Sequence, residues 1–448
     1  MTLPLSLLDA RVPRYTSYPT APHFHPGVDN LVFERWLREL SPDLPLSLYV
    51  HMPFCDTLCW FCGCHTTVIN SHAPVVHYLA DLFTEIGRVA SALGAKRRVS
   101  HLHFGGGSPT IMASKDWYML MEVLRRNFEF VQGAEIAVEI DPRGLTDEAI
   151  ATLAEIGVTR ASIGVQDLDE AVQRSINRIQ PFACTQSAVD RLRAAGIRGL
   201  NIDLVYGLPQ QSEAGLAHTL NQVLTLEPDR LAVFGYAHVP HFKKHQNLID
   251  ARTLPDLMAR ARQFELAQRR IAEAGYQPIG LDHFARSEDG LAIAWREGRL
   301  RRNFQGYSDD DASALIGFGA SAISALPQGY VQNIAAVAQW RSALRQGALP
   351  IARGVALSAD DRLRGTAIER LMCNLEVDLA GVAAGYGQTA DAFADVLPRL
   401  RSLAAQGLVE IDGTTLRVAH EMRAGLRLVC AAFDAYWNEG AVQHAPAV

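Results

Sequence analysis

Four of the seven cysteines in this 448-residue chain fall within ten consecutive residues. The clustered cysteines are Cys55, Cys59, Cys62 and Cys64, whereas Cys184, Cys373 and Cys430 are scattered singly. Closely spaced thiolates bind metals, hold iron–sulfur clusters or exchange disulfides. A secreted disulfide scaffold would instead distribute paired cysteines through a short chain. The pattern therefore favours a reducing compartment and a single metal or redox site.

The spacing of the clustered cysteines is Cys-x3-Cys-x2-Cys, and Cys64 follows two residues later. Three thiolates in one loop can bind three irons of a cubane and leave the fourth iron open to a small molecule. Cys64 could be a fourth ligand, although one short loop would have difficulty reaching all four corners. A structural zinc site normally uses two separated pairs, and a dithiol of Cys59 and Cys62 would leave Cys55 without a role. Zinc, a dithiol and chance clustering remain as alternatives.

Short β-rich segments, each followed by a helical pattern, must position this loop. Strands are expected at 46–51, 100–104, 135–140, 160–165, 199–205 and 231–236. Helices are expected at 75–94, 114–127, 146–156, 184–195, 213–226 and 255–274. This alternation predicts an α/β fold with a parallel sheet and helices outside it. Six units are too few for an eight-fold barrel, so we predict a partial (β/α)6 TIM-like barrel, with a seventh strand at 278–283.

The two regions that flank these strand–helix units have a different sequence pattern. Residues 1–44 contain Pro13, Pro19, Pro22 and Pro26, which predict an extended N-terminal arm. From about Leu357 the pattern changes to amphipathic helices at 363–375, 391–406 and 424–437, with a hairpin at 408–418. We therefore expect an arm at 1–44, the partial barrel at 45–350 and a mainly helical C-terminal domain at 351–448.

Polar residues follow the expected strands where each one ends. A glycine-rich turn at 105–109 follows the second strand, and Glu139 lies near the end of the third. The next three ends carry Gln166 with Asp167, then Asp203, then residues 236–238. Ligand sites in such folds lie at the carboxyl ends of the strands, and glycines let the backbone approach a ligand. Polar groups at consecutive strand ends beside a cysteine loop therefore predict one shared ligand site.

Composition narrows the class of protein. Hydrophobic residues make up 48% of the chain and charged residues 20%, which is typical of a globular protein and not of a disordered one. The net charge of -6 is opposite to the basic excess of most nucleic-acid binders. The N-terminus lacks the charge and the long apolar core of a signal peptide, and the best membrane candidate, residues 312–327, is too short to span a bilayer. We therefore expect a cytoplasmic protein without a membrane span or a nucleic-acid partner.

The cysteine loop after the first strand, with the glycine-rich turn after the second, resembles the radical S-adenosylmethionine (SAM) enzymes. Further segments resemble one family among them, the oxygen-independent coproporphyrinogen III oxidases. These segments are residues 13–21 (PRYTSYPTA), 62–64 (CGC), 201–209 (NIDLVYGLP), 280–286 (GLDHFAR) and 302–307 (RNFQGY). The resemblance runs from about residue 12 into the C-terminal domain.

The resemblance implies the cofactors and the reaction. A [4Fe–4S] cluster would be held by Cys55, Cys59 and Cys62, and its open iron would bind SAM. The reduced cluster would cleave SAM to methionine and a 5′-deoxyadenosyl radical, which would remove a hydrogen atom from a substrate propionate. Loss of carbon dioxide and one electron would leave a vinyl group, and a second round on coproporphyrinogen III would give protoporphyrinogen IX. The protein would supply binding, orientation and exclusion of water and oxygen.

The SAM-binding positions of the family map onto two sets of residues. A first SAM molecule is implied at Tyr49, Gly106, Glu139 and Ile323. A second is implied at Phe61, Gly107, Ser108, Gln166, Arg178, Asp203 and Ala237. Ser108 stands where the family commonly has threonine and keeps the hydroxyl, and Trp60 stands where it commonly has tyrosine. Cys64 is implied near the site without binding the cluster, and our catalytic candidates are Cys64, Tyr49 and Glu139.

Four propionates on the substrate call for cationic partners. The candidates are Arg14, Lys243, Lys244, Arg286, Arg301 and Arg302. Tyr15 and Tyr18 lie in the arm, which the family places over the active site. The resemblance also implies a reduced flavodoxin or ferredoxin as electron donor, and we expect a monomer. The alternative functions are a haem chaperone, a branch that lacks Cys64 and the PRYTSYPT arm, a haem-opening radical methyltransferase, and a zinc-stabilised binding protein.

Overall fold

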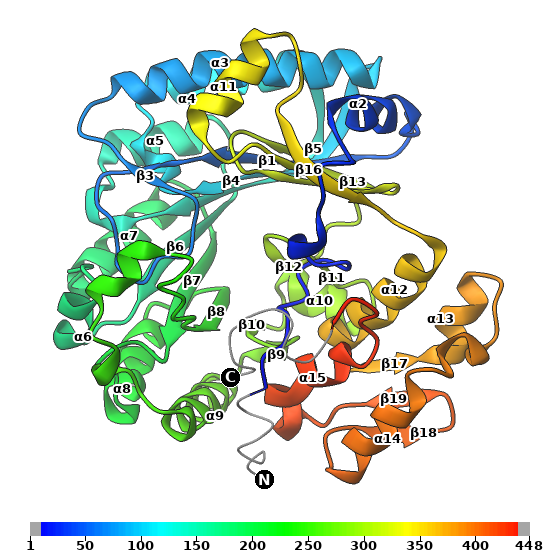
Figure 1. Cartoon of the computed structure of the whole chain (residues 1–448). Helices are drawn as coiled ribbons and strands as arrows, with labels where there is room; N and C mark the ends of the chain where they lie inside the picture. Colours follow the sequence, from blue (N-terminus) through cyan, green and yellow to red (C-terminus); the bar gives the residue numbers. More distant parts are fainter. Residues whose placement is uncertain (1–9, 438–448) are drawn as a thin grey trace.

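One curved sheet of twelve strands organises the computed structural model, which describes residues 10–437 (Figure 1). Its centre is a run of parallel strands in the order β1 (Leu46–Met52), β4 (Arg97–Gly106), β5 (Phe128–Ile140), β6 (Arg160–Gln166), β7 (Gly199–Tyr206) and β8 (Arg230–Gly235). These strands confirm the six that were expected. Apolar strand residues such as Leu46, Leu48 and Val50 are buried, as in a parallel sheet covered by helices.

Helices cover the outer face of this sheet (Figure 1). They are α3 (Ala73–Leu93), α4 (Ser114–Asn127), α5 (Asp147–Glu155), α7 (Phe182–Ala194), α8 (Glu213–Leu224) and α9 (Leu257–Glu273), with a short α6 (Glu170–Ser175) before α7. α5 begins after Thr146, whose side chain accepts a hydrogen bond from the Ala149 N–H. α7 ends just before Gly196, whose φ of +89° is typical of a helix end. The predicted partial α/β barrel is confirmed.

The sheet extends beyond β1, where the sequence analysis identified no strands. β13 (Ala314–Phe318) pairs in parallel with β1, and the antiparallel strands β14 (Ile323–Leu326), β15 (Gly329–Asn333) and β16 (Ile351–Ala356) follow. The membrane candidate at 312–327 therefore contains two strands of the sheet. Because β15 is hydrogen-bonded to β16, a boundary at residue 350 divides neighbouring strands. The division of the chain into three units stays a prediction.

The single strand expected at 278–283 is wrong. The segment forms two short strands, β9 (Gln277–Ile279) and β10 (His283–Ala285), which pair antiparallel with each other. Gly280 makes the turn between them at φ +53°, and a Cβ at this position would collide with the Tyr307 ring. β10 also pairs antiparallel with β8, so the parallel run of strands ends here.

The N-terminal arm is extended only in its first part. Residues 1–9 lie outside the described residues, and the next residues pass between the sheet and the C-terminal helices (Figure 1). The arm then forms α2 (Asn30–Glu39), which the sequence analysis did not predict. Asp29 caps this helix with its side chain, and Phe33, Trp36 and Leu37 are buried. The helix is stabilised because its apolar face packs against the barrel, where α3 is a neighbour.

The C-terminal region is mainly helical, as expected. It contains α12 (Ala359–Asn374), β17 (Glu376–Asp378), α13 (Leu379–Gly385), α14 (Leu397–Ala405), β18 (Glu410–Asp412), β19 (Thr415–Arg417) and α15 (Leu426–Ala431). β18 and β19 confirm the expected hairpin. The last helix is shorter than the expected 424–437, because residues 424–425 belong to a 3-10 helix and residues 432–437 form turns. Residues 438–448 of the expected C-terminal domain lie outside the described residues.

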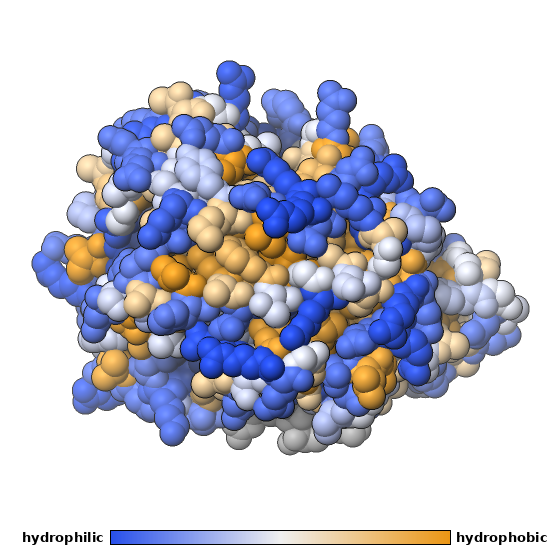
Figure 2. All heavy atoms as spheres, turned by 90° about the horizontal axis from the view of Figure 1, so that it is seen from above, coloured by the Kyte–Doolittle hydropathy of each residue, from blue (hydrophilic) through white to orange (hydrophobic). Residues whose placement is uncertain are grey.

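The remaining strands and helices connect these parts. They are β2 (Phe54–Cys55), β3 (Thr67–Val68), α10 (Gly290–Arg296), β11 (Arg301–Asn303), β12 (Gly306–Ser308) and α11 (Val337–Arg345). Seen from above, hydrophilic residues cover most of the surface, and apolar residues are exposed between them (Figure 2). Within residues 10–437, no helix has the length and apolar character needed to cross a membrane.

Candidate active site

The cysteine loop lies between β2 and β3, shortly after β1 ends. β2 and β3 pair in parallel at Cys55, so the two ends of the loop lie side by side. Two neighbours from the segment after α6 hold the loop. The Trp60 N–H donates to the Ile176 carbonyl at 2.9 Å, and the Asn177 amide donates to the Leu58 carbonyl at 2.9 Å. The barrel therefore fixes the backbone that carries the cysteines.

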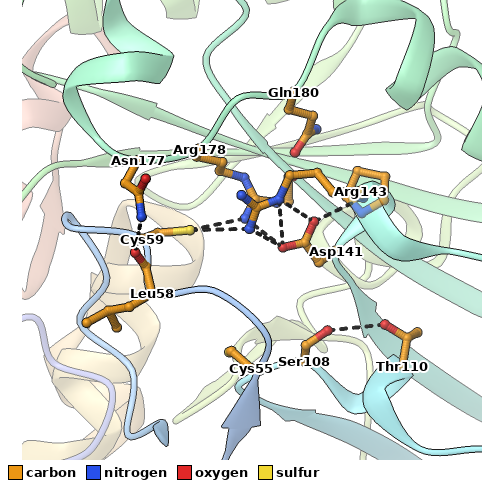
Figure 3. A network of polar contacts seen from close by, with 12 residues as sticks. Cys55, Leu58, Cys59, Ser108, Thr110, Asp141, Arg143, Asn177, Arg178 and Gln180 are labelled. Atoms are coloured by element: carbon orange, nitrogen blue, oxygen red, sulfur yellow. Dashed lines mark hydrogen bonds and ion pairs between the residues drawn. The ribbon is translucent and has the colours of Figure 1, made fainter. Parts of the chain in front are cut away.

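Cys59 is buried and faces two guanidinium groups (Figure 3). Arg143 Nη2 and Arg178 Nη1 each lie 3.5 Å from its Sγ. Both arginines also pair with Asp141 Oδ2, at 2.6 and 3.0 Å, which fixes their orientation. Burial opposes ionisation of Asp141, but its hydrogen bonds and charge pairing with the two arginines hold its pKa below the ordinary value. Positive groups beside a sulfur are the environment of a metal-bound or reactive thiolate.

The sulfurs of the other two predicted cluster ligands also accept hydrogen bonds. Thr66 Oγ1 donates to Cys55 Sγ at 3.1 Å, and the Cys64 N–H donates to Cys62 Sγ at 3.4 Å. Burial raises the pKa of Cys55 to about 11, whereas the hydrogen bond from Cys64 lowers that of Cys62 to about 7. Cys64 is thus a hydrogen-bond donor toward Cys62, which distinguishes it from the other three clustered cysteines.

The glycine-rich turn at the end of β4 approaches the strands around the cysteine loop closely, because Gly106 and Gly107 carry no side chains. A Cβ on Gly107 would lie 2.5 Å from the Phe54 carbonyl oxygen, and one on Gly106 would lie 2.7 Å from the His51 ring. Gly106 also has φ +116°, which other residues rarely adopt. Its N–H donates to Glu139 Oε2 at 3.2 Å, so the turn is tied to the end of β5.

A cavity of about 270 Å³ opens between the cysteine loop, the glycine-rich turn and the strand ends. Most of the predicted site residues line it, namely Cys55, Cys59, Phe61, Cys62, Cys64, Gly106, Gly107, Ser108, Glu139, Gln166, Arg178 and Asp203. They come from the cysteine loop, from the ends of β4 to β7 and from the segment after α6. The expectation of one shared site at the carboxyl ends of these strands therefore agrees with the geometry.

Three predicted site residues do not line this cavity. Tyr49 lies on β1, and Ile323 begins β14. Ala237 follows β8 and lies close to Phe61, because Gln246 Nε2 donates to the backbone carbonyls of both residues, at 3.2 and 3.0 Å. Their roles as SAM contacts stay predictions.

Two carboxylates in the cavity have different electrostatic environments. Burial opposes ionisation of Glu139, but the hydrogen bond from His103 Nε2 at 3.2 Å holds its pKa below the ordinary value. Burial raises the pKa of Asp203, whose oxygens accept hydrogen bonds from Asn201 and Ser162 at 2.8 and 3.0 Å. Glu139 is therefore suited to a cationic or N–H group, and Asp203 to a neutral hydroxyl group.

Asp167, predicted from the same strand end as Gln166, belongs to the barrel wall and not to the cavity. Its side chain is buried and accepts hydrogen bonds from Gln211 at 2.6 Å and from Thr219 at 3.1 Å. Gln166 has φ +68° and lies at a register shift between β6 and β7. This break in the regular strand lets Gln166 line the cavity while the next residue packs into the wall.

A second cavity, of about 400 Å³, borders on the first, and Cys64 lines both. It is lined by four arginines, which are Arg14, Arg260, Arg302 and Arg427. Asp282 and several aromatic residues complete the wall. Arg14 comes from the arm, Arg260 from α9 and Arg427 from α15, so distant parts of the chain meet here. This concentration of positive charge suits a ligand with several carboxylates.

The basic residues predicted from the sequence separate into two groups. Arg14 and Arg302 line the second cavity. The others lie elsewhere: Lys243 donates to the Cys64 carbonyl, Lys244 is exposed, Arg286 lies over the Tyr276 ring, and Arg301 pairs with Glu369. The sequence analysis missed Arg260 and Arg427. Arg260 lies in the arginine-rich helix α9, where no local pattern singles it out. Arg427 is the only charge in the apolar helix α15, and this signal could have found it. The sequence analysis also missed Arg143, although this residue follows a polar strand end.

Comparisons with known proteins agree with this geometry. Residues 49–223 match the Radical SAM superfamily, and residues 357–421 match the HemN C-terminal domain. The chain is 48% identical over 446 residues to an oxygen-independent coproporphyrinogen III oxidase of Bradyrhizobium diazoefficiens, with 100% of this chain and 99% of that protein covered. A protein of the same name from Salmonella typhimurium is 40% identical, with 96% of this chain and 94% of that protein covered.

A solved structure matches the whole fold. Coproporphyrinogen III oxidase (HemN) from Escherichia coli, described as a radical SAM enzyme, has a TM-score of 0.92 and 39% sequence identity, covering 98% of this chain and 100% of that one. The match includes the barrel with its cysteine loop and the helical C-terminal region together. A radical SAM enzyme uses a [4Fe–4S] cluster and SAM. This chain, with its cysteine loop at the carboxyl ends of the barrel strands, therefore belongs to the oxygen-independent coproporphyrinogen III oxidase family of radical SAM enzymes.

Proposed function

We propose that this enzyme converts two propionate side chains of coproporphyrinogen III into vinyl groups without oxygen, giving protoporphyrinogen IX. The observation that carries the proposal is the position of Cys64 in the walls of both cavities. A cavity lined by four arginines, suited to a tetracarboxylate, thereby borders on the cavity that contains the cysteine loop. The names of the relatives from Bradyrhizobium diazoefficiens and Salmonella typhimurium support the same reaction.

Cys55, Cys59 and Cys62 would hold the cluster. The fit rests on the hydrogen bond that each of these three sulfurs accepts from a neighbouring donor. Within residues 10–437, no three His, Cys, Asp or Glu side chains are grouped to hold a single metal ion, whereas a four-iron cubane spreads its thiolate ligands over separate corners. When bound, the cluster and SAM supply the radical chemistry that removes a hydrogen atom from the substrate.

The protein would bind two SAM molecules beside the cysteine loop. The ionised Glu139 and the backbone of Gly106 would hold the first, with Tyr49 and Ile323 nearby. The second would contact Phe61, Gly107, Ser108, Gln166, Arg178, Asp203 and Ala237. Support comes from the convergence of most of these residues on one cavity. Cys64, Tyr49 and Glu139 would act closest to the reacting groups.

The substrate would bind through its carboxylates and its pyrrole N–H groups. Guanidinium groups such as those of Arg14 and Arg302 would pair with propionates. Burial opposes ionisation of Asp282, but a hydrogen bond with His283 Nδ1 at 2.7 Å lowers its pKa to about 2. Asp282 would therefore be a carboxylate that can accept hydrogen bonds from pyrrole N–H groups.

The free cysteines bear on the compartment in which the enzyme works. We propose that it works as a monomer in the cytoplasm, where reduced thiols persist. A reduced flavodoxin or ferredoxin would supply the electron that the cluster needs.

Product analysis tests the proposed function. Anaerobically reconstituted protein, given a reductant, SAM and coproporphyrinogen III, should form 5′-deoxyadenosine and a product that has lost two carboxyl groups. Cys59→Ser should abolish both products together with the iron–sulfur absorbance, whereas the control Cys184→Ser should retain them. Deoxyadenosine formation without decarboxylation would refute the substrate assignment, and a fully active Cys59→Ser enzyme would refute the cluster assignment.

A further inference from the structure

Residues 239–249, which we call the basic loop, lie directly against the cysteine loop. Three of its side chains bind backbone carbonyls of the cysteine loop. Lys243 Nζ donates to the Cys64 carbonyl at 2.9 Å, His245 Nε2 lies 2.7 Å from the Cys62 carbonyl, and Gln246 Nε2 donates to the Phe61 carbonyl at 3.0 Å. The basic loop is therefore in direct contact with residues 61–64 of the cysteine loop.

A buried glutamine fixes the shape of the basic loop. The Gln246 side chain is 1% exposed, and besides Phe61 it binds two groups of its own segment. It accepts a hydrogen bond from the Val239 N–H at 2.6 Å and donates to the Ala237 carbonyl at 3.2 Å. The Gln246 side chain therefore fixes the backbone of the basic loop and at the same time contacts the cysteine loop.

The outward side of the basic loop is apolar and positively charged. Phe242 is 77% exposed and Leu248 is 58% exposed, and Lys243 Nζ lies 5.7 Å from the centre of the Phe242 ring. Lys244 is exposed and forms no ion pair with any residue from 10 to 437. Asp250, the acid that follows the basic loop, is already paired with Arg252 at 2.8 Å. An exposed aromatic residue next to an exposed lysine without an ion-pair partner, here Phe242 and Lys244, is typical of a protein docking surface.

We propose that the basic loop is the docking surface for the electron donor, a small acidic one-electron carrier protein. This inference rests on the proposed function, because the cluster must be reduced before it can act. The whole chain has a net charge of -6 and repels an acidic partner in general. Local positive charge at the basic loop would then steer an acidic carrier to the part of the surface that contacts the cluster-binding loop. Contact through Phe242 and the exposed Lys244 suits the small, short-lived interfaces of electron carriers.

Reduction kinetics test this proposal. The cluster in the full-length reconstituted enzyme is reduced anaerobically by an acidic flavodoxin hydroquinone or by a reduced plant-type ferredoxin, and its absorbance is followed at several salt concentrations. Lys244→Glu and Phe242→Ala should each lower the second-order rate constant about tenfold or more at low salt. The matched control Lys115→Glu makes the same charge change on α4 and should leave the rate unchanged. Wild-type rates should fall as salt is raised, and those of Lys244→Glu should fall less.

Dithionite separates docking from the chemistry itself. With dithionite as reductant, Lys244→Glu and Phe242→Ala should form 5′-deoxyadenosine and decarboxylated product at the wild-type rate. Equal losses with dithionite and with the carrier would overturn the docking proposal, because the basic loop would then only support the cysteine loop. Equal effects of Lys244→Glu and Lys115→Glu would overturn it too, as would a wild-type dimer that Phe242→Ala dissociates in sedimentation. Failure of the wild-type enzyme with dithionite would instead refute the proposed function.

Discussion

Cys59 shows how single residues outside the cysteine motif tune the site. The family resemblance implied Cys55, Cys59 and Cys62 as cluster ligands, but it did not show that two arginines face Cys59. Arg143 and Arg178 donate to Cys59 Sγ and share Asp141 as their counterion. Hydrogen bonds and positive charge at a cluster sulfur favour the reduced, more negative state of a cluster. Asp141 keeps both guanidinium groups oriented, and its single negative charge does not neutralise the two positive charges.

Arg143→Gln should therefore lower the reduction potential of the cluster. The change removes a positive charge and one donor at Cys59, and we expect a fall of about 60 mV, equivalent to about 1.4 kcal/mol for a one-electron couple. An anaerobic redox titration followed by electron paramagnetic resonance measures the potential. Arg191→Gln is the matched control, since Arg191 pairs with Asp147 away from the cysteines. An unchanged or higher potential in Arg143→Gln would contradict this role.

At the scale of secondary-structure elements, strands β13 to β16 are joined to the barrel by Glu85, a buried acid on α3. Glu85 is 2% exposed and accepts hydrogen bonds from the Gly319 N–H at 2.8 Å and from Asn333 Nδ2 at 2.6 Å. It thus links α3 to the turn after β13 and to β15. A charged residue on the buried face of a helix is costly, so its position signals a specific partner. The partner lies more than two hundred residues later in the chain and could not be identified from local pattern.

Glu85 should make the stability of the protein depend on pH. Burial raises its pKa from 4.5 to about 8 in the folded state. Between these pH values the folded protein holds one more proton than the unfolded chain. The contribution of Glu85 to the free energy of unfolding is therefore fully present below pH 4.5 and is lost as pH rises through about 8. The contribution changes by up to about 1.4 kcal/mol per pH unit.

Glu85→Gln cannot titrate, so its unfolding free energy should vary less than that of the wild type between pH 5 and 8. Anaerobic urea unfolding followed by tryptophan fluorescence measures the difference. Glu122→Gln is the control, because Glu122 is exposed and pairs with Arg126 on the same helix. Identical pH profiles for wild type and Glu85→Gln would show that Glu85 does not titrate in this range.

At the scale of the whole molecule, the arginine-lined cavity forms only when the arm and the C-terminal region close on the barrel. The arm is held by the Tyr15 hydroxyl, which donates to Asp434 at 3.1 Å, and by the Tyr18 hydroxyl, which accepts from the Ala435 N–H at 3.0 Å. These bonds place Arg14 at the cavity, where its Nη2 donates to the Gly235 carbonyl at 3.2 Å. The arm and the C-terminal region thus contribute to one wall of the arginine-lined cavity.

Arg14→Gln should weaken binding of coproporphyrinogen III. A charge-assisted hydrogen bond to a carboxylate contributes about 1.5–3 kcal/mol, so we expect KM to rise about tenfold to a hundredfold with little change in the uncoupled cleavage of SAM. Arg286→Gln is the matched control, because Arg286 lies over the Tyr276 ring and not in the cavity. Steady-state kinetics over a range of substrate concentrations separate the two variants, and equal KM values would contradict the assignment.

The sequence by itself determined the parallel barrel strands, their helices and the cysteine loop, because these depend on local periodicity and on spacing within one segment. It also determined most of the residues that line the cavity beside the cysteine loop, since consecutive parallel strands bring their carboxyl ends together. Strands β13 to β16 escaped prediction because their short runs carry no periodic signal of their own. β13 is stabilised by pairing with β1, and β14 to β16 follow it in the sheet as antiparallel neighbours.

The tertiary structure decided which charges line the arginine-lined cavity. The sequence analysis had proposed Arg14, whereas only the fold brings Arg260 of α9 and Arg427 of α15 to the same wall. The fold also separated Gln166, which lines the cavity beside the cysteine loop, from Asp167, which packs in the barrel wall. The physical reason is the same in both cases, since the free energy of placing a polar group depends on partners that only the folded chain brings within hydrogen-bond distance.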